Sequence, residues 1–256
     1  MFKIATWNVN SLRVRLSQLL DWLQVEQPQV MALQETKVTD PSFPRAEFEA
    51  IGYYPLFSGQ KSYNGVALLS QMPGREVMTD LPDWSDDQRR ILGATYAGIR
   101  VINVYVPNGA SVDSDKYDYK LNWLEHFYQY IRANLITHPQ MIILGDFNIA
   151  LQDIDLYDPK AWQGKVIASP PERVALQKLL DLGLQDTFRL FEQPEKSFSW
   201  WDYRTHAFQR NLGVRIDLIL ASHVLKCQSC KIDRQPRTVE RPSDHTPVIA
   251  TFNVSF

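Results

Sequence analysis

Residues 91–106 read ILGATYAGIRVINVYV. Two apolar runs of strand length follow each other here with no helical segment between them. Gly98 lies near their junction, where a tight turn would fit. Strict alternation of strands and helices would have indicated a doubly wound parallel sheet. The tandem pair instead predicts an antiparallel β-hairpin, within an α/β protein of the α+β type.

Short apolar runs of the same kind recur on both sides of this hairpin. They lie at 3–9, 30–34, 65–70, 141–145, 215–221 and 248–254. Helical periodicity, with apolar residues every three or four positions, occurs in the segments 11–26, 116–135 and 171–182. The strands outnumber the helices, and we find neither a repeat of fixed period nor a linker. We therefore expect residues 1–256 to form a single domain.

The composition is that of an ordinary globular protein, with 45% hydrophobic and 22% charged residues. A net charge of −2 argues against a histone-like protein that binds nucleic acid through bulk positive charge. A local basic rim would still be enough for a nucleic-acid enzyme. No apolar run approaches the roughly 18–20 residues of a membrane span, and the N-terminus lacks the apolar core of a signal peptide. We therefore expect a cytoplasmic protein without membrane contacts, and a monomer by default.

Polar side chains gather at the ends of the apolar runs. They are Asn8, Asn10, Glu35, Asn108, Asp146, Asn148, Asp217, Asp244 and His245. Hard oxygen ligands collected from several strand ends are what Mg²⁺ prefers. Asp and Asn are also common turn residues, so each of these positions taken alone favours a turn or strand cap, and it is their number that points to a metal site. Spacing alone therefore indicates a metal enzyme as one interpretation among others.

Nine motifs occur in the order and rough spacing of bacterial exonuclease III. They are WNVNSLR (7–13), LQETK (33–37), YNGVALLS (63–70), NVYVPNG (103–109), LGDFNIA (144–150), PPER (170–173), SWWDYR (199–204), RIDLILAS (215–222) and ERPSDHTPV (240–248). Over essentially its whole length the chain resembles exonuclease III and the abasic-site endonucleases. These belong to the superfamily of Mg²⁺-dependent endonucleases, exonucleases and phosphatases. The resemblance implies a four-layered α/β sandwich, in which two facing, mostly antiparallel sheets carry helices outside and the active site at one end.

The same resemblance implies the role of individual residues. The implied catalytic residues are Tyr105, Asp146, Asn148, Asp217 and His245. The residues implied to line or complete a site for Mg²⁺, with Mn²⁺ as an alternative ion, are Asn8, Glu35, Asp146, Asn148, Asp244 and His245. The implied substrate-binding residues are Arg90, Asn108, Lys116, Lys120, Ile167 and Trp200. Further basic residues near the motifs are expected to form a rim that contacts DNA phosphates: Arg13, Arg15, Lys37, Lys61, Arg89, Arg204, Arg210 and Arg215.

The implied function is a metal-dependent DNA repair nuclease that acts on double-stranded DNA with 3′ ends or abasic sites. Two alternatives remain open, another phosphoesterase of the same fold and a non-catalytic RNA-binding relative. The complete set of implied ligands argues against the second. The balance between 3′–5′ exonuclease, 3′-end phosphodiesterase and abasic-site endonuclease activity does not follow from these motifs.

One position bears on that balance. In typical abasic-site endonucleases of the family, a small residue stands six positions before the arginine of the PPER motif, beside the pocket for the flipped abasic sugar. Here that position is Ile167. Flipping a nucleotide costs a few kcal/mol, which a close-fitting pocket must recover. A β-branched side chain would fill part of such a pocket, so we expect a preference for 3′-terminal substrates over internal abasic sites.

Overall fold

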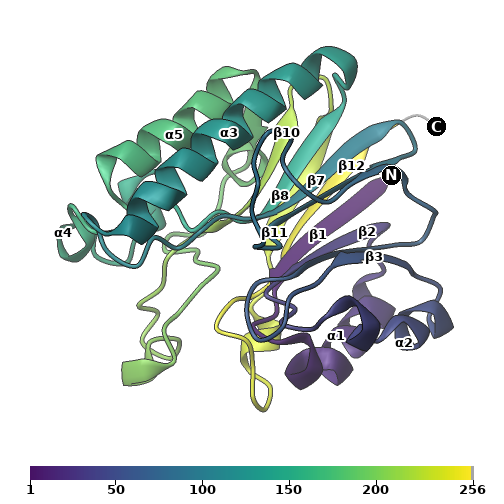
Figure 1. Cartoon of the computed structure of the whole chain (residues 1–256). Coiled ribbons are helices and arrows are strands. Elements are labelled where there is room, and N and C mark those ends of the chain that lie inside the picture. The colour runs from purple at the N-terminus through teal and green to yellow at the C-terminus, as the bar shows by residue number, and fades with distance from the viewer. Residues whose placement is uncertain (255–256) are drawn as a thin grey trace.

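Two six-stranded sheets pack face to face in the computed structural model, which describes residues 1–254, and helices cover their outer sides (Figure 1). The first sheet has the order β11-β12-β1-β2-β4-β3 and consists of β1 (Phe2–Asn8), β2 (Val30–Gln34), β3 (Tyr54–Ser58), β4 (Val66–Ser70), β11 (Lys226–Ile232) and β12 (Val248–Asn253). The second has the order β5-β6-β7-β8-β10-β9 and consists of β5 (Arg75–Met78), β6 (Ile91–Tyr96), β7 (Ile99–Tyr105), β8 (Met141–Asp146), β9 (Leu184–Asp186) and β10 (Asp217–Ser222).

The helices form the two outer layers. They are α1 (Leu12–Glu26), α2 (Arg45–Ala50), α3 (Asp115–Thr137), α4 (Pro159–Trp162) and α5 (Pro170–Asp181), with short 3₁₀ turns at Asp40–Ser42, Asp153–Asp155, Thr187–Leu190, Arg204–His206 and Gln235–Arg237. Figure 1 shows α1 and α2 on the outer side of the first sheet, and α3 and α5 on that of the second. The predicted helices agree with α1, α3 and α5 to within two residues at each end. In residues 1–254 no helix combines the length and apolar character needed to cross a membrane.

The hairpin predicted from residues 91–106 is confirmed. Strands β6 and β7 pair antiparallel, from Ile91 opposite Val104 to Tyr96 opposite Ile99. The two residues between them, Ala97 and Gly98, have φ angles of 50° and 81°. Two left-handed residues in a two-residue loop match the twist of the flanking strands, which is why glycine suits this position.

Each sheet contains one parallel pair among otherwise antiparallel neighbours, which confirms the mostly antiparallel sandwich. The pairs are β1–β2, connected through α1, and β7–β8, connected through α3. The carboxyl ends of two parallel strands leave the sheet at the same edge, and the register brings Asn8 opposite Gln34 and Tyr105 opposite Asp146. Strand β10 runs antiparallel to β8 and places Asp217 opposite Asp146. Polar residues distant in sequence thus meet at one edge of the sandwich.

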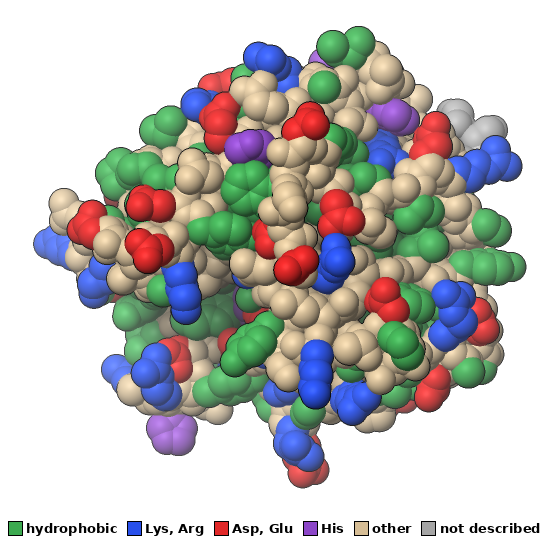
Figure 2. Space-filling model, in the orientation of Figure 1, with side chains coloured by type: hydrophobic (Ala, Val, Ile, Leu, Met, Phe, Trp, Pro, Cys, Tyr) green, Lys and Arg blue, Asp and Glu red, His purple; other side chains and the backbone are tan. Residues whose placement is uncertain are grey.

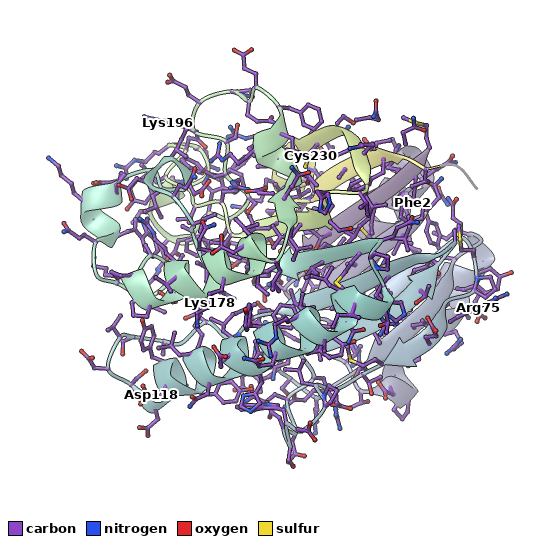
Figure 3. The ribbon with its side chains drawn as sticks, turned by 90° about the horizontal axis from the view of Figure 1, so that it is seen from above. Phe2, Arg75, Asp118, Lys178, Lys196 and Cys230 are labelled. Carbon is purple, nitrogen blue, oxygen red and sulfur yellow. The ribbon has the colours of Figure 1, made fainter. Side chains whose placement is uncertain are left out.

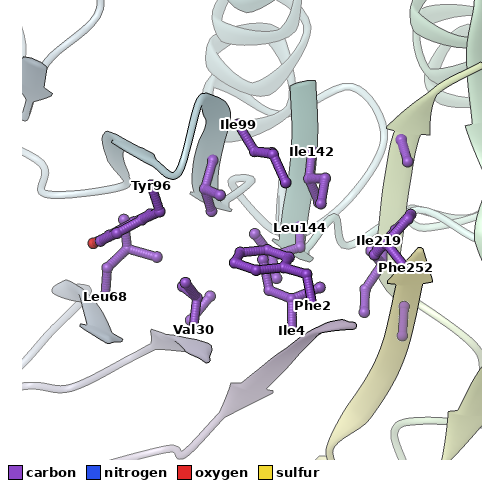
Figure 4. Close-up of a cluster of buried hydrophobic side chains, with 14 of the residues drawn as sticks. Phe2, Ile4, Val30, Leu68, Tyr96, Ile99, Ile142, Leu144, Ile219 and Phe252 are labelled. Carbon is purple, nitrogen blue, oxygen red and sulfur yellow. The ribbon is translucent and has the colours of Figure 1, made fainter. Parts of the chain in front are cut away.

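The space between the sheets is filled by apolar side chains from both. Figure 4 shows Phe2, Ile4 and Val30 from the first sheet facing Ile142 and Leu144 from the second, all of them buried. Full burial of such a side chain is worth roughly 1.5–3 kcal/mol. This inner layer holds the two sheets in a fixed relation, and therefore fixes the distances between functional groups that different sheets contribute.

Candidate active site

The loops at this edge hold several non-glycine residues in the left-handed backbone region. Asn10, Glu35 and Asn148 have φ angles of 41°, 51° and 49°. Such residues cost of order 1–3 kcal/mol each and persist where the surroundings determine the backbone. Here the backbone N–H of Ser11 donates to the carbonyl oxygen of Glu35 at 2.8 Å, and so ties two of these loops together. Residue type alone gave no signal for this feature.

Asn8 connects two carboxylates across the sandwich. Its Nδ2 donates to Glu35 Oε1 at 2.8 Å and to Asp146 Oδ2 at 2.9 Å, while its Oδ1 accepts from the backbone N–H of Asn10 at 3.0 Å. The amide nitrogen therefore faces the carboxylates and the amide oxygen faces its own turn. In this arrangement Asn8 links the two acidic groups, and its predicted place in a metal site stays a prediction.

His245 is held against Asp217 in a buried pair. The imidazole Nδ1 lies 2.8 Å from Asp217 Oδ2, and Nε2 lies 3.6 Å from Asp146 Oδ2. Burial by itself disfavours the imidazolium, but the negative charges of Asp217 and Asp146 outweigh it and raise the pKa of His245 to about 10. The ring is therefore a cation at neutral pH, with its orientation fixed by Asp217.

Asp146 is fully enclosed by these groups. Burial raises the pKa of its carboxyl, and the charges of Asp217 and Glu35 raise it further, against the opposing effects of His245 and Asn8. A carboxylate with a raised pKa accepts a proton more readily, which is what a general base requires. The other carboxylate oxygen, Oδ1, accepts the backbone N–H of Asn148 at 2.9 Å.

Tyr105 and Arg90 stand beside the carboxylates. Burial raises the pKa of the Tyr105 phenol well above its usual value, and the charges of Glu35 and Asp146 add to this, so the phenol carries its proton at neutral pH. The Arg90 guanidinium lies over the Tyr105 ring at 4.8 Å from its centroid and donates to the Tyr105 carbonyl oxygen at 3.3 Å. These contacts leave Arg90 half-buried, at the margin of the site.

The donor set of this edge fits a divalent metal ion. Ligand atoms of Glu35, Asp146 and His245 lie within 4.8 Å of one another. Carboxylate oxygens are the ligands that Mg²⁺ prefers, and His245 Nδ1 is already paired with Asp217, so the Glu35 and Asp146 carboxylates are the groups that would hold the ion. Lys37, which is predicted only for the basic rim, also contacts Glu35, at 2.8 Å from Nζ to Oε2.

The Asp244 carboxylate contacts Asn10 and Trp200 rather than the other acidic groups of the site. Its Oδ1 accepts from Asn10 Nδ2 at 2.9 Å, and its Oδ2 accepts from Trp200 Nε1 at 3.0 Å. It thus lies outside the group formed by Glu35, Asp146 and His245, and its contacts fix the Trp200 ring beside the site.

The structure corrects the predicted role of Lys120 as a substrate-binding residue. Lys116 and Asn108 are exposed, but the Lys120 side chain is fully buried and paired with Glu172, so the prediction that it contacts DNA is wrong. Arg215 is corrected in the same way, because it is buried between Asp155 and Asp186. Acidic and basic side chains are interspersed over the face shown in Figure 2, without one large basic patch there.

Ile167 lies in a small apolar cluster near Trp200. It is 5% exposed and packs in a cluster with Ala150, Leu156, Ala168, Val214 and Ile216, against which Trp162, Val166 and Trp200 also pack. The Trp162 and Trp200 rings meet edge to face, with their centroids 6.5 Å apart. Ile167 has a φ of 81°, which is unusual for a β-branched residue. Its side chain therefore occupies space beside the Trp162 and Trp200 rings.

A four-layered sandwich that joins two carboxylates, a charged imidazole and its aspartate at one edge defines a metal-dependent phosphoesterase. The sequence profile of the Endonuclease/Exonuclease/phosphatase family matches residues 5–245, and the chain belongs to this family.

Three full-length relatives make the comparison more specific. Exodeoxyribonuclease III of Haemophilus influenzae is 37% identical, over 98% of this chain and 99% of that protein. The structure of the 3′ phosphatase NExo from Neisseria, bound to a product DNA hairpin, has a TM-score of 0.97 and 43% identity, covering 99% of this chain and 100% of that one. An AP endonuclease from Archaeoglobus fulgidus has a TM-score of 0.96 and 42% identity, with the same coverage. The predicted family, the sandwich fold and a hydrolytic nuclease of the exonuclease III type are confirmed, and the RNA-binding alternative is not favoured.

Proposed function

We propose that this protein is a Mg²⁺-dependent DNA repair nuclease that hydrolyses phosphate esters at the 3′ ends of double-stranded DNA. One observation carries the proposal: Asp146 lies between the charged His245 and the Glu35 carboxylate, at one edge of the sandwich. That edge supplies a base, a cation and a metal-binding carboxylate to one reacting phosphate. The monomeric state, the single domain and the cytoplasmic location stay predictions.

The residues divide the reaction between them. Asp146 takes the proton of the attacking water, and the His245 imidazolium stabilises the negative charge on the phosphoryl oxygens. Asn148 has one amide hydrogen left for the same oxygens after donating to the Val106 carbonyl at 3.0 Å. A divalent ion held by Glu35 and Asp146 would supply further charge neutralisation.

Removal of the metal tests the proposed chemistry. We expect degradation of a duplex with a recessed 3′ end to require Mg²⁺ and to stop when EDTA is added, because the Glu35 and Asp146 carboxylates repel an anionic phosphate unless a divalent cation is held between them. Glu35→Ala should raise the Mg²⁺ concentration for half-maximal rate by about tenfold or more, as loss of a ligand usually weakens a metal site. An enzyme active in EDTA would refute the metal requirement. An unchanged Mg²⁺ dependence in Glu35→Ala would remove Glu35 from the metal site.

The preference for 3′ ends over internal abasic sites is supported by the place of Ile167. Its buried side chain packs in the cluster that includes Trp200, where the family resemblance puts the pocket for an abasic sugar. The comparisons leave both activities open, because the Neisseria 3′ phosphatase and the Archaeoglobus AP endonuclease are almost equally similar to this chain. A side chain that fills the pocket removes the contacts that recover the cost of flipping.

Ile167→Gly should shift the enzyme towards internal sites. The substitution opens the pocket, and glycine adopts the φ of 81° at this position without strain. We expect the ratio of kcat/KM for an internal tetrahydrofuran site to that for a recessed 3′ end to rise by about tenfold, the effect of roughly 1.4 kcal/mol of regained binding. Ile154→Gly removes the same side chain from an exposed position and serves as the control. An unchanged ratio would show that Ile167 does not select the substrate.

A further inference from the structure

A buried ion pair joins α3 to α5 beneath the active-site loops. Lys120 on α3 and Glu172 in the first turn of α5 have fully buried side chains, and the Lys120 ammonium contacts Glu172 Oε1. Lys120 Nζ also donates to the carbonyl oxygens of Asn148 at 2.8 Å and Asn108 at 3.1 Å. An ammonium has three hydrogens, so all of its donors are used.

The other partner of the pair holds a different loop. Glu172 Oε1 accepts the backbone N–H of Ile167 at 3.0 Å, and Oε2 accepts the backbone N–H of Ser169 at 3.0 Å together with its hydroxyl. The Ser169 hydroxyl also lies 2.6 Å from the Tyr117 hydroxyl on α3. Glu172 therefore holds the Ile167 N–H, while the backbone N–H of Ala150 donates to the Ile167 carbonyl oxygen at 2.8 Å, and together they fix its left-handed conformation.

The pair thus connects three loops that approach the site from separate parts of the chain. One carries Asn108, one carries Asn148 and one carries Ile167. The backbone N–H of Asn148 in turn donates to Asp146. A buried ion pair contributes little net stability compared with apolar side chains of the same volume, so stability alone does not account for a lysine and a glutamate here. A fully satisfied buried polar network also rigidifies the groups that it connects. Fixing the relative positions of the three loops is therefore the more specific effect of this pair.

We propose that Lys120 and Glu172 are positioning residues that couple the Ile167 loop to the Asn108 and Asn148 loops, and so set rate and substrate preference together. This inference rests on the proposed function, because it concerns the choice between 3′ ends and internal sites. Neither residue touches the reacting atoms. Displacement of catalytic groups by about 1 Å can cost 10²-fold in rate, so a connection of this kind has measurable consequences.

The test replaces the pair by a neutral one. Lys120→Met combined with Glu172→Gln removes both buried charges. Either substitution alone would leave the other charge buried without a partner. The matched control is Glu125→Gln with Lys178→Met, an exposed pair at 3.3 Å that joins the same two helices. Figure 3 shows Lys178 on α5 beside α3. Thermal unfolding establishes that each variant is folded before kinetics are measured.

In the neutral-pair variant we expect kcat on a recessed 3′ end to fall by about tenfold or more with KM changed less than about threefold, because positioning is lost and binding is kept. The ratio of internal-site to 3′-end cleavage should rise, and adding Ile167→Gly should raise it much less than in the wild type, since the loop is already released. The control pair should leave kcat, KM and the ratio unchanged.

A folded neutral-pair variant with wild-type kcat, or one in which Ile167→Gly has its full effect on the ratio, would overturn the coupling. If that variant does not fold, Ser169→Ala removes the hydroxyl that donates to Glu172 and contacts Tyr117, and it should change the ratio in the same direction to a smaller degree. An unchanged ratio in Ser169→Ala would overturn the inference. Failure of the proposed function looks different, because the wild type itself would then cleave neither substrate.

Discussion

Replacing His245 with alanine is expected to lower the single-turnover rate of phosphate-ester hydrolysis by about 10²–10⁴-fold. The charged imidazole is buried beside Asp146, where the low dielectric makes its interaction with a phosphoryl oxygen stronger than it would be in water. DNA affinity should change less than about threefold, because most of the affinity comes from phosphate contacts along the duplex. Rapid-quench cleavage with enzyme in excess, and a binding titration in Ca²⁺, measure the two quantities.

Two companion variants locate the origin of the effect. Asp217→Ala should lose a comparable part of the rate, because Asp217 fixes the ring and maintains its charge. His206→Ala removes an exposed histidine and should leave the rate unchanged. A His245→Ala enzyme within about threefold of the wild-type rate would contradict the assigned role, since positioned acid–base groups contribute far more than that.

Replacing Arg215 with methionine is expected to lower the free energy of unfolding by about 3–5 kcal/mol. Its guanidinium is buried, with Nε 2.7 Å from Asp155 Oδ1 and Nη2 2.7 Å from Asp186 Oδ2. Methionine fills a similar volume but leaves two buried carboxylates without this partner; Asp155 keeps a second cation, Arg189, whereas Asp186 keeps the backbone N–H of Phe188 at 3.2 Å. Urea unfolding followed by circular dichroism gives the difference.

The control is Arg204→Met, which breaks an ion pair of similar length on the surface. Arg204 lies 2.6 Å from Asp202, but its side chain is 84% exposed, so we expect a change below about 1 kcal/mol. Equal effects of the two variants would refute the importance of burial. Burial by itself would raise the pKa of Asp155, but Arg215 and Arg189 hold it below its usual value. The stabilisation from this cluster is therefore present above about pH 4 and is lost as the pH falls below that.

The features predicted best from the sequence are those that depend on neighbouring residues in the chain. The hairpin at 91–106 and the three long helices follow from local periodicity. The polar residues that end the apolar runs also lie at the ends of the observed strands. Whether these ends meet depends on the order of the strands in the two sheets. That order was implied by the family resemblance of the motifs and does not follow from the periodicity of the residues. The left-handed backbone of Glu35 is likewise set by a hydrogen bond to a distant loop.

Lys120 shows that the sequence indicates a buried lysine on α3 but does not identify its partner. Lys116 and Lys120 both lie near a motif, yet only the first is exposed. The position of Lys120 continues the buried stripe of α3 through Leu124, Phe127 and Ile131. A lysine in such a stripe needs a buried partner, and the stripe could have indicated one. The partner itself, Glu172, is 52 residues away and follows only from the three-dimensional fold.

The pairing of β12 with β1 has a consequence for biosynthesis. Strand β1 lies between β2 and β12, and the Ser243 hydroxyl donates to the Asn8 carbonyl oxygen at 2.7 Å. A ribosome makes Asn8, Glu35, Asp146 and Asp217 well before it adds His245. Until then, β1 has an unpaired edge towards the missing strand, and the nascent chain has no imidazolium to place beside Asp146. We therefore expect a partly translated polypeptide to hydrolyse phosphate esters no faster than the His245→Ala variant, until residue 245 has emerged and the last strand has folded against the first.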